Sequence, residues 1–342
     1  MKTITFGEIM LRLSPPGFKR FTQTDSLDVT FGGGEANVAV ALANFGCESH
    51  FVSKLPCHEI GQAAVNHLRR YGVSDRHIVR EGDRIGIYFL ESGASQRSSK
   101  VIYDRAHAAI TTLTDADLDV KAIFKGADWF HWTGITPALG PVARKTLTAL
   151  CRAAKRSGVT VSCDLNYRKK LWTTDEAQRV MRPLMEYVDV CIANEEDAHR
   201  SLGLKAEKSD VETGKLDELA YANLVRQLKS EFGFSTVAVT LRESHSASQN
   251  GWSAIMVDDK DCARPHRSTR YEIQLVDRVG GGDAFAAGLI AGLSQKSSTK
   301  DALEFAVAAS CLKQTIPGDF NLVTVEEVDS LVSGSGSGRV ER

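Results

Sequence analysis

The sequence of 342 residues lacks a long apolar run, an excess of either charge and any pair of closely spaced cysteines. No stretch approaches the ~18 apolar residues of a membrane-spanning helix, and an acid, Glu8, interrupts the start where a secretory signal would be apolar. The 42 Lys and Arg balance 43 Asp and Glu, which argues against a polycation that binds nucleic acid through its phosphates. We therefore expect a cytoplasmic protein that binds neither a membrane nor nucleic acid.

Metal sites and disulfides are not predicted either. The seven cysteines are odd in number and include no C-x-x-C pair, and neither they nor the nine histidines show metal-ligand spacing. Cysteines scattered in this way are typical of buried, reduced thiols. They stand at positions 47, 57, 151, 163, 191, 262 and 311.

Short apolar runs, typical of strands, alternate with longer stretches in which apolar residues recur at helical spacing. This alternation predicts an α/β fold with parallel strands, right-handed crossovers and helices on both faces of the sheet. Functional side chains should then gather at the carboxyl ends of the strands. The clearest strands are expected at 159–165, 188–193 and 236–241, and the clearest helices at 141–157, 195–202 and 216–232.

Two segments break this rhythm. Residues 10–34 lack helical spacing, and residues 86–105 contain two β-prone runs around the polar turn 92–95. We interpret them as strands of a small separate sheet that covers a cleft; the alternative is two unrelated surface hairpins. The Ser/Gly-rich tail, residues 333–342, is predicted to be disordered.

Residues 277–290 carry the strongest chemical signal. Gly280, Gly281 and Gly282 precede Asp283, and the apolar residues that follow keep helical spacing, so Asp283 is expected in the first turn of a helix. The amides of such a glycine loop can bind phosphate, and the carboxylate can take the proton of a hydroxyl that attacks a phosphoryl group. No lysine follows the glycines, which argues against a P-loop. The alternative is an ordinary helix start with a favourable acid.

Two motifs connect the sequence with a known family. Residues 277–283, D-R-V-G-G-G-D, resemble the signature D-T-x-G-A-G-D of the ribokinase-like (PfkB) carbohydrate kinases, with Arg278 for the usual Thr and Gly281 for the usual Ala. Residues 32–39, G-G-G-E-A-N-V-A, match the family's G-G-x-x-x-N-x-A. The resemblance implies a three-layer α/β/α Rossmann-like domain with a small β-sheet lid. We expect the domain at 1–10, 35–85 and 106–332, and the lid at 11–34 and 86–105.

Within the family, residues 86–90, 101–106 and 164–168 resemble the branch that phosphorylates 2-keto-3-deoxygluconate on its C6 hydroxyl. Guanidinium groups suit the carboxylate of a sugar acid, although each arginine could instead form a surface ion pair. The alternatives are a kinase of a neutral sugar such as fructose or ribose, and a non-catalytic sugar or nucleotide sensor. The resemblance assigns substrate binding to Gly34, Asn37, Tyr88, Tyr103, Arg105, Asn166 and Arg168.

The resemblance also implies ATP, Mg²⁺ and a monovalent cation such as K⁺. Asp283 would be the base, with the amides of Gly280, Gly281 and Gly282 stabilising the transferring phosphoryl group. Asn194 and Asp197, in a segment N-E-E-D that replaces the family's N-x-x-E, would meet the metal through water. An exposed lid suggests a homo-oligomer. Nucleotide contacts are expected from Asn194, Thr240, Ser244, Gly280 and Gly282.

Overall fold

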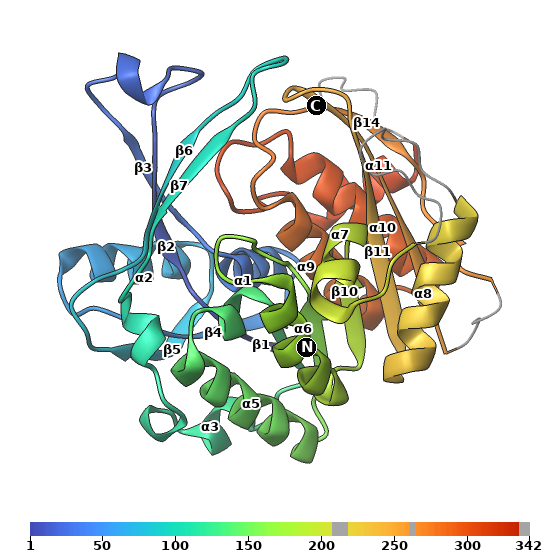
Figure 1. Ribbon diagram of the computed structural model, residues 1–342, viewed down its shortest axis with the longest axis horizontal. Helices are drawn as coiled ribbons and strands as arrows, with labels where there is room; N and C mark the ends of the chain where they lie inside the picture. The colour runs from blue at the N-terminus through green and yellow to red at the C-terminus, as the bar shows by residue number, and fades with distance from the viewer. Residues whose placement is uncertain (207–217, 260–263, 335–342) are drawn as a thin grey trace.

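A computed structural model describes residues 1–206, 218–259 and 264–334 (Figure 1). Ten strands of this part of the chain form one large sheet. They are β1 (Lys2–Phe6), β4 (Glu48–Leu55), β5 (Ser74–Arg80), β8 (Trp129–Thr133), β9 (Thr160–Asp164), β10 (Val190–Ala193), β11 (Thr236–Ser244), β12 (Gln249–Asp258), β13 (His266–Arg267) and β14 (Tyr271–Gln274).

The centre of this sheet is parallel. Strands β11, β10, β9, β8, β1, β4 and β5 lie side by side in that order and all pair in parallel, whereas β12, β13 and β14 add antiparallel pairs beyond β11. Parallel neighbours need a long connection back across the sheet, and helices supply it here. The predicted α/β class is confirmed.

Helices fill most of these connections. The α-helices are α1 (Gly34–Asn44), α2 (Glu59–Arg70), α3 (Val120–Phe124), α4 (Ile135–Ala138), α5 (Pro141–Arg156), α6 (Thr174–Leu184), α7 (Glu195–Asp197), α8 (Glu218–Phe232), α9 (Gly281–Gln295), α10 (Thr299–Lys313) and α11 (Val325–Val332). A π-helix, η5 (Ala198–Leu202), continues α7, and 3-10 turns lie at η1 (Phe21–Gln23), η2 (Ala109–Thr112), η3 (Asp115–Asp117) and η4 (Met185–Tyr187).

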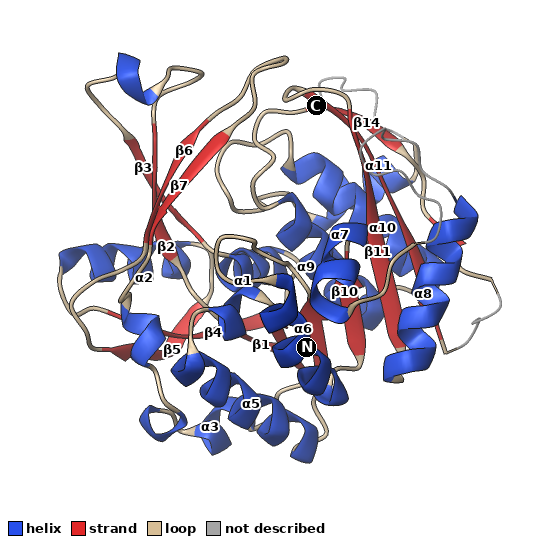
Figure 2. Ribbon diagram, viewed as in Figure 1, coloured by secondary structure: helices blue, strands red, loops and turns tan. Residues whose placement is uncertain are grey.

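Alternate residues of β10 show the three layers. Cys191 and Ala193 pack into a core with α5, α6 and α8, whereas Val190 and Ile192 pack into a second core with α1, α9 and α10. Successive side chains of a strand point to opposite faces, so both faces of the central strands are buried under helices. Figure 2 shows the same arrangement at the other end of the sheet, where α1 and α2 lie on one side of β4 and α3 and α5 on the other.

A second sheet stands apart from these layers. Its four strands pair in the order β3-β2-β6-β7, and we call it the lid. The two irregular segments form this one sheet because β2 and β6 pair in parallel, so the alternative of two unrelated hairpins is excluded. The strands are β2 (Met10–Ser14), β3 (Asp28–Gly32), β6 (Ile87–Glu91) and β7 (Lys100–Asp104).

Some predictions need correction. Strand β11 does not end at residue 241 but continues to Ser244, because its hairpin with β12 pairs every residue from Thr236 to Ser244. Cys57 is exposed, unlike the other cysteines described, which are buried. Cys262, residues 216–217 and tail residues 335–342 lie outside the described residues. Within the described ranges, no helix has the length and apolarity needed to cross a membrane.

Candidate active site

A cavity of about 450 Å³ lies between the lid and the carboxyl ends of the parallel strands. The strands β9 and β10 end at this cavity, and the start of α9 closes it from the side. Of the site residues predicted from the sequence, only Ser244 does not line it. The others are Gly34, Asn37, Tyr88, Tyr103, Arg105, Asn166, Arg168, Asn194, Asp197, Thr240, Gly280, Gly281, Gly282 and Asp283.

The glycine loop forms the first turn of α9 as predicted. Gly280 has a φ of +80° and packs so closely on residue 319 that a Cβ would lie 2.0 Å from the Asp319 carbonyl oxygen. The Gly281 amide donates to the Arg278 carbonyl at 3.3 Å. The amides of Gly282 and Asp283 have no main-chain acceptor in the described part of the chain. Two amides at a helix start are therefore open to an anion.

Asp283 is the third residue of α9 and lies beside the open amides. Its Oδ2 accepts a hydrogen bond from Asn37 Nδ2 at 2.6 Å, and a Cβ on Gly34 would lie 3.6 Å from Oδ1. Burial raises the pKa of the Asp283 carboxyl to about 6, against the lowering effects of the Asn37 hydrogen bond and the Arg168 charge. A carboxyl with this pKa is ionised at neutral pH and still basic enough to take a proton.

Two further acids line the cavity, Asp164 at the end of β9 and Asp197 at the end of α7, which follows β10. Burial raises the pKa of Asp164 well above its usual range, and the charges of Asp197 and Asp283 add to the rise. Burial also raises the pKa of Asp197 to about 6. Asp197 Oδ1 accepts from the Tyr167 amide at 3.0 Å, and Asn194 Oδ1 accepts from the Asp197 amide at 2.8 Å. The side chain of Asn194 thus caps α7 while it lines the cavity.

This acidic edge fits a hydrated Mg²⁺ better than a directly bound metal. No group of three or more His, Cys, Asp or Glu in the described residues could hold a metal ion. Mg²⁺ keeps several waters and is commonly bound through one or two carboxylates together with phosphates. Asp164 and Asp197 repel each other's charge, and a cation between them would relieve that repulsion.

The two predicted carboxylate-binding arginines line the same cavity but differ in their surroundings. Arg105 is not a surface residue: its Nη2 donates to the buried Glu8, and its guanidinium lies 5.3 Å from the centre of the Tyr103 ring. Among the residues that the structure describes, Arg105 Nε has no hydrogen-bond partner. Arg168 is exposed, and its charge lowers the pKa of Asp197 and Asp283. Both arginines therefore retain donors for a bound anion.

Two other arginines lie on the nucleotide side of the predicted site. Arg278, which departs from the family signature, and Arg242 both line the cavity. Burial, together with the neighbouring charge of Arg242, lowers the pKa of Arg278 to about 10. Burial also lowers the pKa of Arg242, and a bound anion would stabilise the charged form of both guanidinium groups. Thr240 also lines this part, from within β11, and donates to the Ala193 carbonyl at 3.4 Å.

The lid touches the rest of the protein on both sides of the cavity. At its tip, the Ser95 amide donates to Ser248 Oγ at 2.9 Å, and the Ser95 carbonyl accepts from the Ala247 amide at 2.7 Å. Figure 1 shows this tip, between β6 and β7, beside the far end of the large sheet. Lys170 Nζ donates to the Val101 carbonyl of β7 at 2.9 Å. The cavity is thus roofed by a closed lid.

Sequence reasoning missed the buried charges behind the glycine loop. Arg12 of β2 forms ion pairs with Asp277 and Asp319, each at 2.6 Å, and the Lys313 ammonium donates to the Asp277 carbonyl at 2.9 Å. An arginine inside the apolar run Met10–Ser14 was the one local signal. It could not identify the partners, because they lie 265 and 307 positions away.

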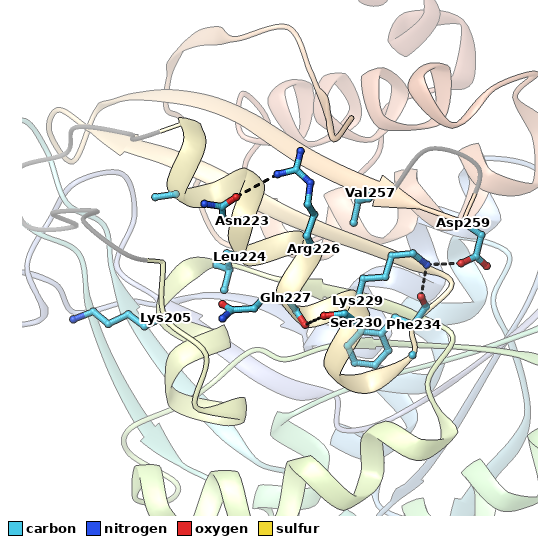
Figure 3. Close-up of a pocket in the computed structure, with 12 residues that line it drawn as sticks. Lys205, Asn223, Leu224, Arg226, Gln227, Lys229, Ser230, Phe234, Val257 and Asp259 are labelled. Atoms are coloured by element: carbon cyan, nitrogen blue, oxygen red, sulfur yellow. Dashed lines mark hydrogen bonds and ion pairs between the residues drawn. The ribbon is translucent and has the colours of Figure 1, made fainter. Parts of the chain in front are cut away.

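A larger cavity, about 730 Å³, lies beside α8 and is less suited to chemistry (Figure 3). Its Lys229 is bonded to Asp259 and to the Phe234 carbonyl, and Arg226 donates to Asn223 (Figure 3). Among the described residues that line it, the one carboxylate is that of Asp259, which is paired with Lys229. We therefore assign the active site to the cavity under the lid.

The remaining sequence candidates belong to the core, as predicted. His131 is fully buried, with Nδ1 2.8 Å from Ser162 Oγ, and burial lowers its pKa to about 3. Trp129, Trp132 and Trp172 are also buried. None of these four side chains lines the cavity under the lid.

A glycine loop at a helix start, an adjacent carboxylate and a lid over the ends of parallel strands define a phosphotransferase of the ribokinase-like class. Residues 2–322 match the pfkB family carbohydrate kinases, and the chain belongs to this family. It is 34% identical to a 2-dehydro-3-deoxygalactonokinase of Haloferax volcanii, over 98% of both chains. It is 27% identical to a 2-dehydro-3-deoxygluconokinase of Bacillus subtilis, over 97% and 96%.

The solved structures agree in fold. A 2-dehydro-3-deoxygluconokinase of Thermotoga maritima is 54% identical and superposes with a TM-score of 0.93, over 98% of this chain and 100% of that one. A protein of Escherichia coli described as ribokinase II and solved with ATP and Mg²⁺ superposes with a TM-score of 0.78 at 21% identity, over 97% and 99%. The expected three-layer domain with its β-sheet lid is confirmed.

Proposed function

We propose that this protein phosphorylates the C6 hydroxyl of 2-keto-3-deoxygluconate (2-dehydro-3-deoxygluconate), using ATP. The observation that carries the proposal is that Asp283, two open helix-start amides and the arginines Arg105 and Arg168 line one cavity under the lid. The name of the Thermotoga maritima relative, 54% identical over nearly the whole chain, supports the choice of sugar acid.

In the proposed reaction, Asp283 takes the proton of the C6 hydroxyl as its oxygen attacks the γ-phosphorus. A P–O bond forms to the sugar, the bond to the β-phosphate oxygen breaks, and ADP leaves. The amides of Gly282 and Asp283 face the oxygens that gain charge, together with the guanidinium groups of Arg242 and Arg278. Asn37 holds the Asp283 carboxylate in place through its 2.6 Å hydrogen bond.

The carboxylate of the sugar would lie between Arg105 and Arg168. Glu8 accepts from one terminal nitrogen of Arg105, which fixes the plane of the guanidinium and leaves its other donors free. Tyr88 and Tyr103, with rings 6.1 Å apart, form a wall beside it. Binding energy gained at this remote end orients the hydroxyl toward the phosphate.

Asn194 and Asp197 would contact Mg²⁺ through water, and the metal would supply charge neutralisation to the ATP phosphates. A monovalent cation is also part of the proposal. The Asp277 carboxylate is not available as a ligand, because it already accepts from Arg12 and from the Val279 and Gly318 amides. The ligands of the cation would therefore be mainly main-chain oxygens. Since the reaction consumes ATP, we place it in the cytoplasm.

We infer that residues 11–34 and 86–105 act as the lid and residues 1–10, 35–85 and 106–332 as the kinase domain. The lid would also join two copies of the chain. Leu13, Val29, Phe89 and Ile102 are neighbours in one row across its outer face, and Val29 and Ile102 are 65% and 55% exposed. An exposed apolar row of this kind favours a partner surface.

Sedimentation tests the oligomer. Val29→Asp with Ile102→Asp should convert a dimer or larger assembly to monomers, whereas Ile60→Asp, at a 46% exposed position on α2, should not. A monomeric wild-type protein would exclude the lid interface.

An assay of ADP release tests the substrate. We expect turnover with 2-keto-3-deoxygluconate to exceed turnover with fructose or ribose, and the galactonate epimer shows how far the site distinguishes sugar stereochemistry. Faster turnover of a neutral sugar would exclude a sugar-acid kinase. ATP binding without ADP release from any sugar would indicate a sensor.

Arginine variants test the carboxylate site. A hydrogen bond to a charged group contributes about 1.5–3 kcal/mol, so Arg168→Ala should raise KM for the sugar acid roughly 10- to 150-fold. KM for ATP should change little. Arg156→Ala, at an exposed position at the end of α5, is the matched control. An unchanged sugar KM in Arg168→Ala would refute this assignment.

A further inference from the structure

The strongest unassigned feature is the buried charge cluster that joins the lid to the glycine loop. Arg12 is the third residue of the lid strand β2 and is 5% exposed. Its two terminal nitrogens donate to different acids, Nη1 to Asp319 Oδ1 and Nη2 to Asp277 Oδ2, each at 2.6 Å. Neither acid belongs to the lid.

Both acids hold the glycine loop in shape. Asp277 Oδ1 accepts from the Val279 amide at 3.0 Å, and its Oδ2 accepts from the Gly318 amide at 3.1 Å. The Asp319 carbonyl lies directly against Gly280. The two partners of Arg12 therefore fix the backbone on both sides of the loop that presents the Gly282 and Asp283 amides.

Two more lid strands converge on Asp319. The Tyr88 hydroxyl, from β6, donates to Asp319 Oδ2. At the end of β3, Gly32 packs so closely that a Cβ would lie 2.2 Å from the same oxygen. Three of the four lid strands thus contact one buried carboxylate. If the lid moved outward, Asp277 and Asp319 would lose the paired Arg12 cation in a buried setting and keep only the charge of the buried Lys313 nearby, which is unfavourable.

From these contacts we propose that Arg12 is a positioning residue that makes the phosphate-binding shape of the glycine loop depend on the position of the lid. Sugar binding under the lid and nucleotide binding at the loop then favour each other. ATP would meet a fully formed anion site only when a sugar holds the lid closed, which limits transfer to water. This inference rests on the proposed kinase activity and not on the identity of the sugar.

The test measures coupling between the two ligands. The affinity for 2-keto-3-deoxygluconate is determined by calorimetry with and without a non-hydrolysable ATP analogue. In the wild type, the analogue should tighten sugar binding about fivefold or more. In Arg12→Gln this ratio should fall toward one, and kcat should fall roughly 100-fold, the typical cost of a small misplacement of catalytic groups. Arg12→Lys should restore part of both.

The matched control is Arg97→Gln. Arg97 is another lid arginine, but the acceptors of its hydrogen bonds, on Phe18, Glu91 and Ser92, all belong to the lid segments. This variant should keep the wild-type coupling ratio and kcat. If Arg12→Gln folds poorly, the pair Arg12→Gln with Asp319→Asn, which removes one charge of each sign, provides the same measurement.

Loss of thermal stability in Arg12→Gln with an unchanged coupling ratio and kcat would overturn the inference, because the cluster would then be only structural. A wild type without coupling would overturn it equally. A wild type that releases no ADP with any sugar is a different result, since it refutes the proposed kinase function itself.

Discussion

Replacing the proposed base, Asp283→Asn, should abolish most activity and yet stabilise the folded protein. The new amide keeps nearly the same shape, and its oxygen can still accept from Asn37 Nδ2, which now bonds Oδ2 at 2.6 Å. Without a group that takes the hydroxyl proton, kcat should fall roughly 10²- to 10⁴-fold. Sugar affinity should change little.

The stability gain follows from the raised pKa of Asp283. Burial raises it to about 6 from an ordinary value of 3.8. The folded state therefore binds the proton more tightly than the unfolded state, and this carboxyl costs stability as the pH rises from about 4 through 6. The difference corresponds to about 3 kcal/mol. Because water reaches part of the side chain, we expect about 1–2 kcal/mol at pH 7.

Urea denaturation of wild type and variant at pH 4 and pH 7 measures this gain, which should be present at pH 7 and nearly absent at pH 4. The matched control is Asp301→Asn, at the third residue of α10. There, hydrogen bonds from Ser298 and Ser297 lower the pKa of the carboxyl, so removing its charge should destabilise the protein at pH 7. Near-wild-type kcat in Asp283→Asn, or a loss of stability equal at both pH values, would refute the reasoning.

Three further changes test other parts of the site. Arg278→Thr should raise KM for ATP about tenfold, as expected for a lost charged hydrogen bond, and leave KM for the sugar unchanged. An ATP KM equal to that of the wild type would exclude a contact between Arg278 and the phosphates. Gly280→Ala places a Cβ 2.0 Å from the Asp319 carbonyl oxygen at a φ of +80°, so both kcat and the melting temperature should fall. Gly282→Ala is the control for stability: a Cβ there meets open space, so the melting temperature should stay at the wild-type value. Burial raises the pKa of Glu35 to about 7 from 4.5, so wild-type stability should fall as the pH rises from 5 to 8, by up to about 3 kcal/mol. In Glu35→Gln, which keeps an oxygen for Thr133 and Thr136, urea denaturation should show a weaker fall.

The parts of the site that are local in sequence were predictable. The glycine loop and Asp283 lie within four consecutive positions. A glycine at position 280 indicates close backbone packing, because any other residue would place a Cβ there. The lid was predictable for a similar reason, since β6 and β7 form a hairpin within 86–105. The pairing of β2 with β6, which makes the lid one sheet, joins positions about 75 apart, so the local pattern favoured one sheet but left two unrelated hairpins open.

Errors arose where pairing with a distant segment decides the outcome. The pattern of apolar residues ends β11 near residue 241, but the hairpin with β12 extends it to Ser244. As a result Ser244 is the last residue of the strand rather than part of the loop after it, and it lies away from the cavity. Hydrogen bonds to a neighbouring strand stabilise polar residues in extended conformation whatever their own propensity, so the periodicity of one segment cannot show where such a strand ends.

The roles of the charged residues at the site also depend on distant segments rather than on local sequence. Arg105 and Arg12 have similar sequence surroundings, each an arginine beside β-prone residues of the lid. Arg105 lines the cavity and its Nε has no partner among the described residues, while both terminal nitrogens of Arg12 are bonded to buried acids. What separates them is the count of carboxylates that the fold brings to each: Glu8 alone for Arg105, Asp277 and Asp319 for Arg12. A buried guanidinium whose donors are used is a fixed part of the structure, and one with donors to spare is a binding group, so the function of each arginine is decided by long-range topology and not by the residues next to it.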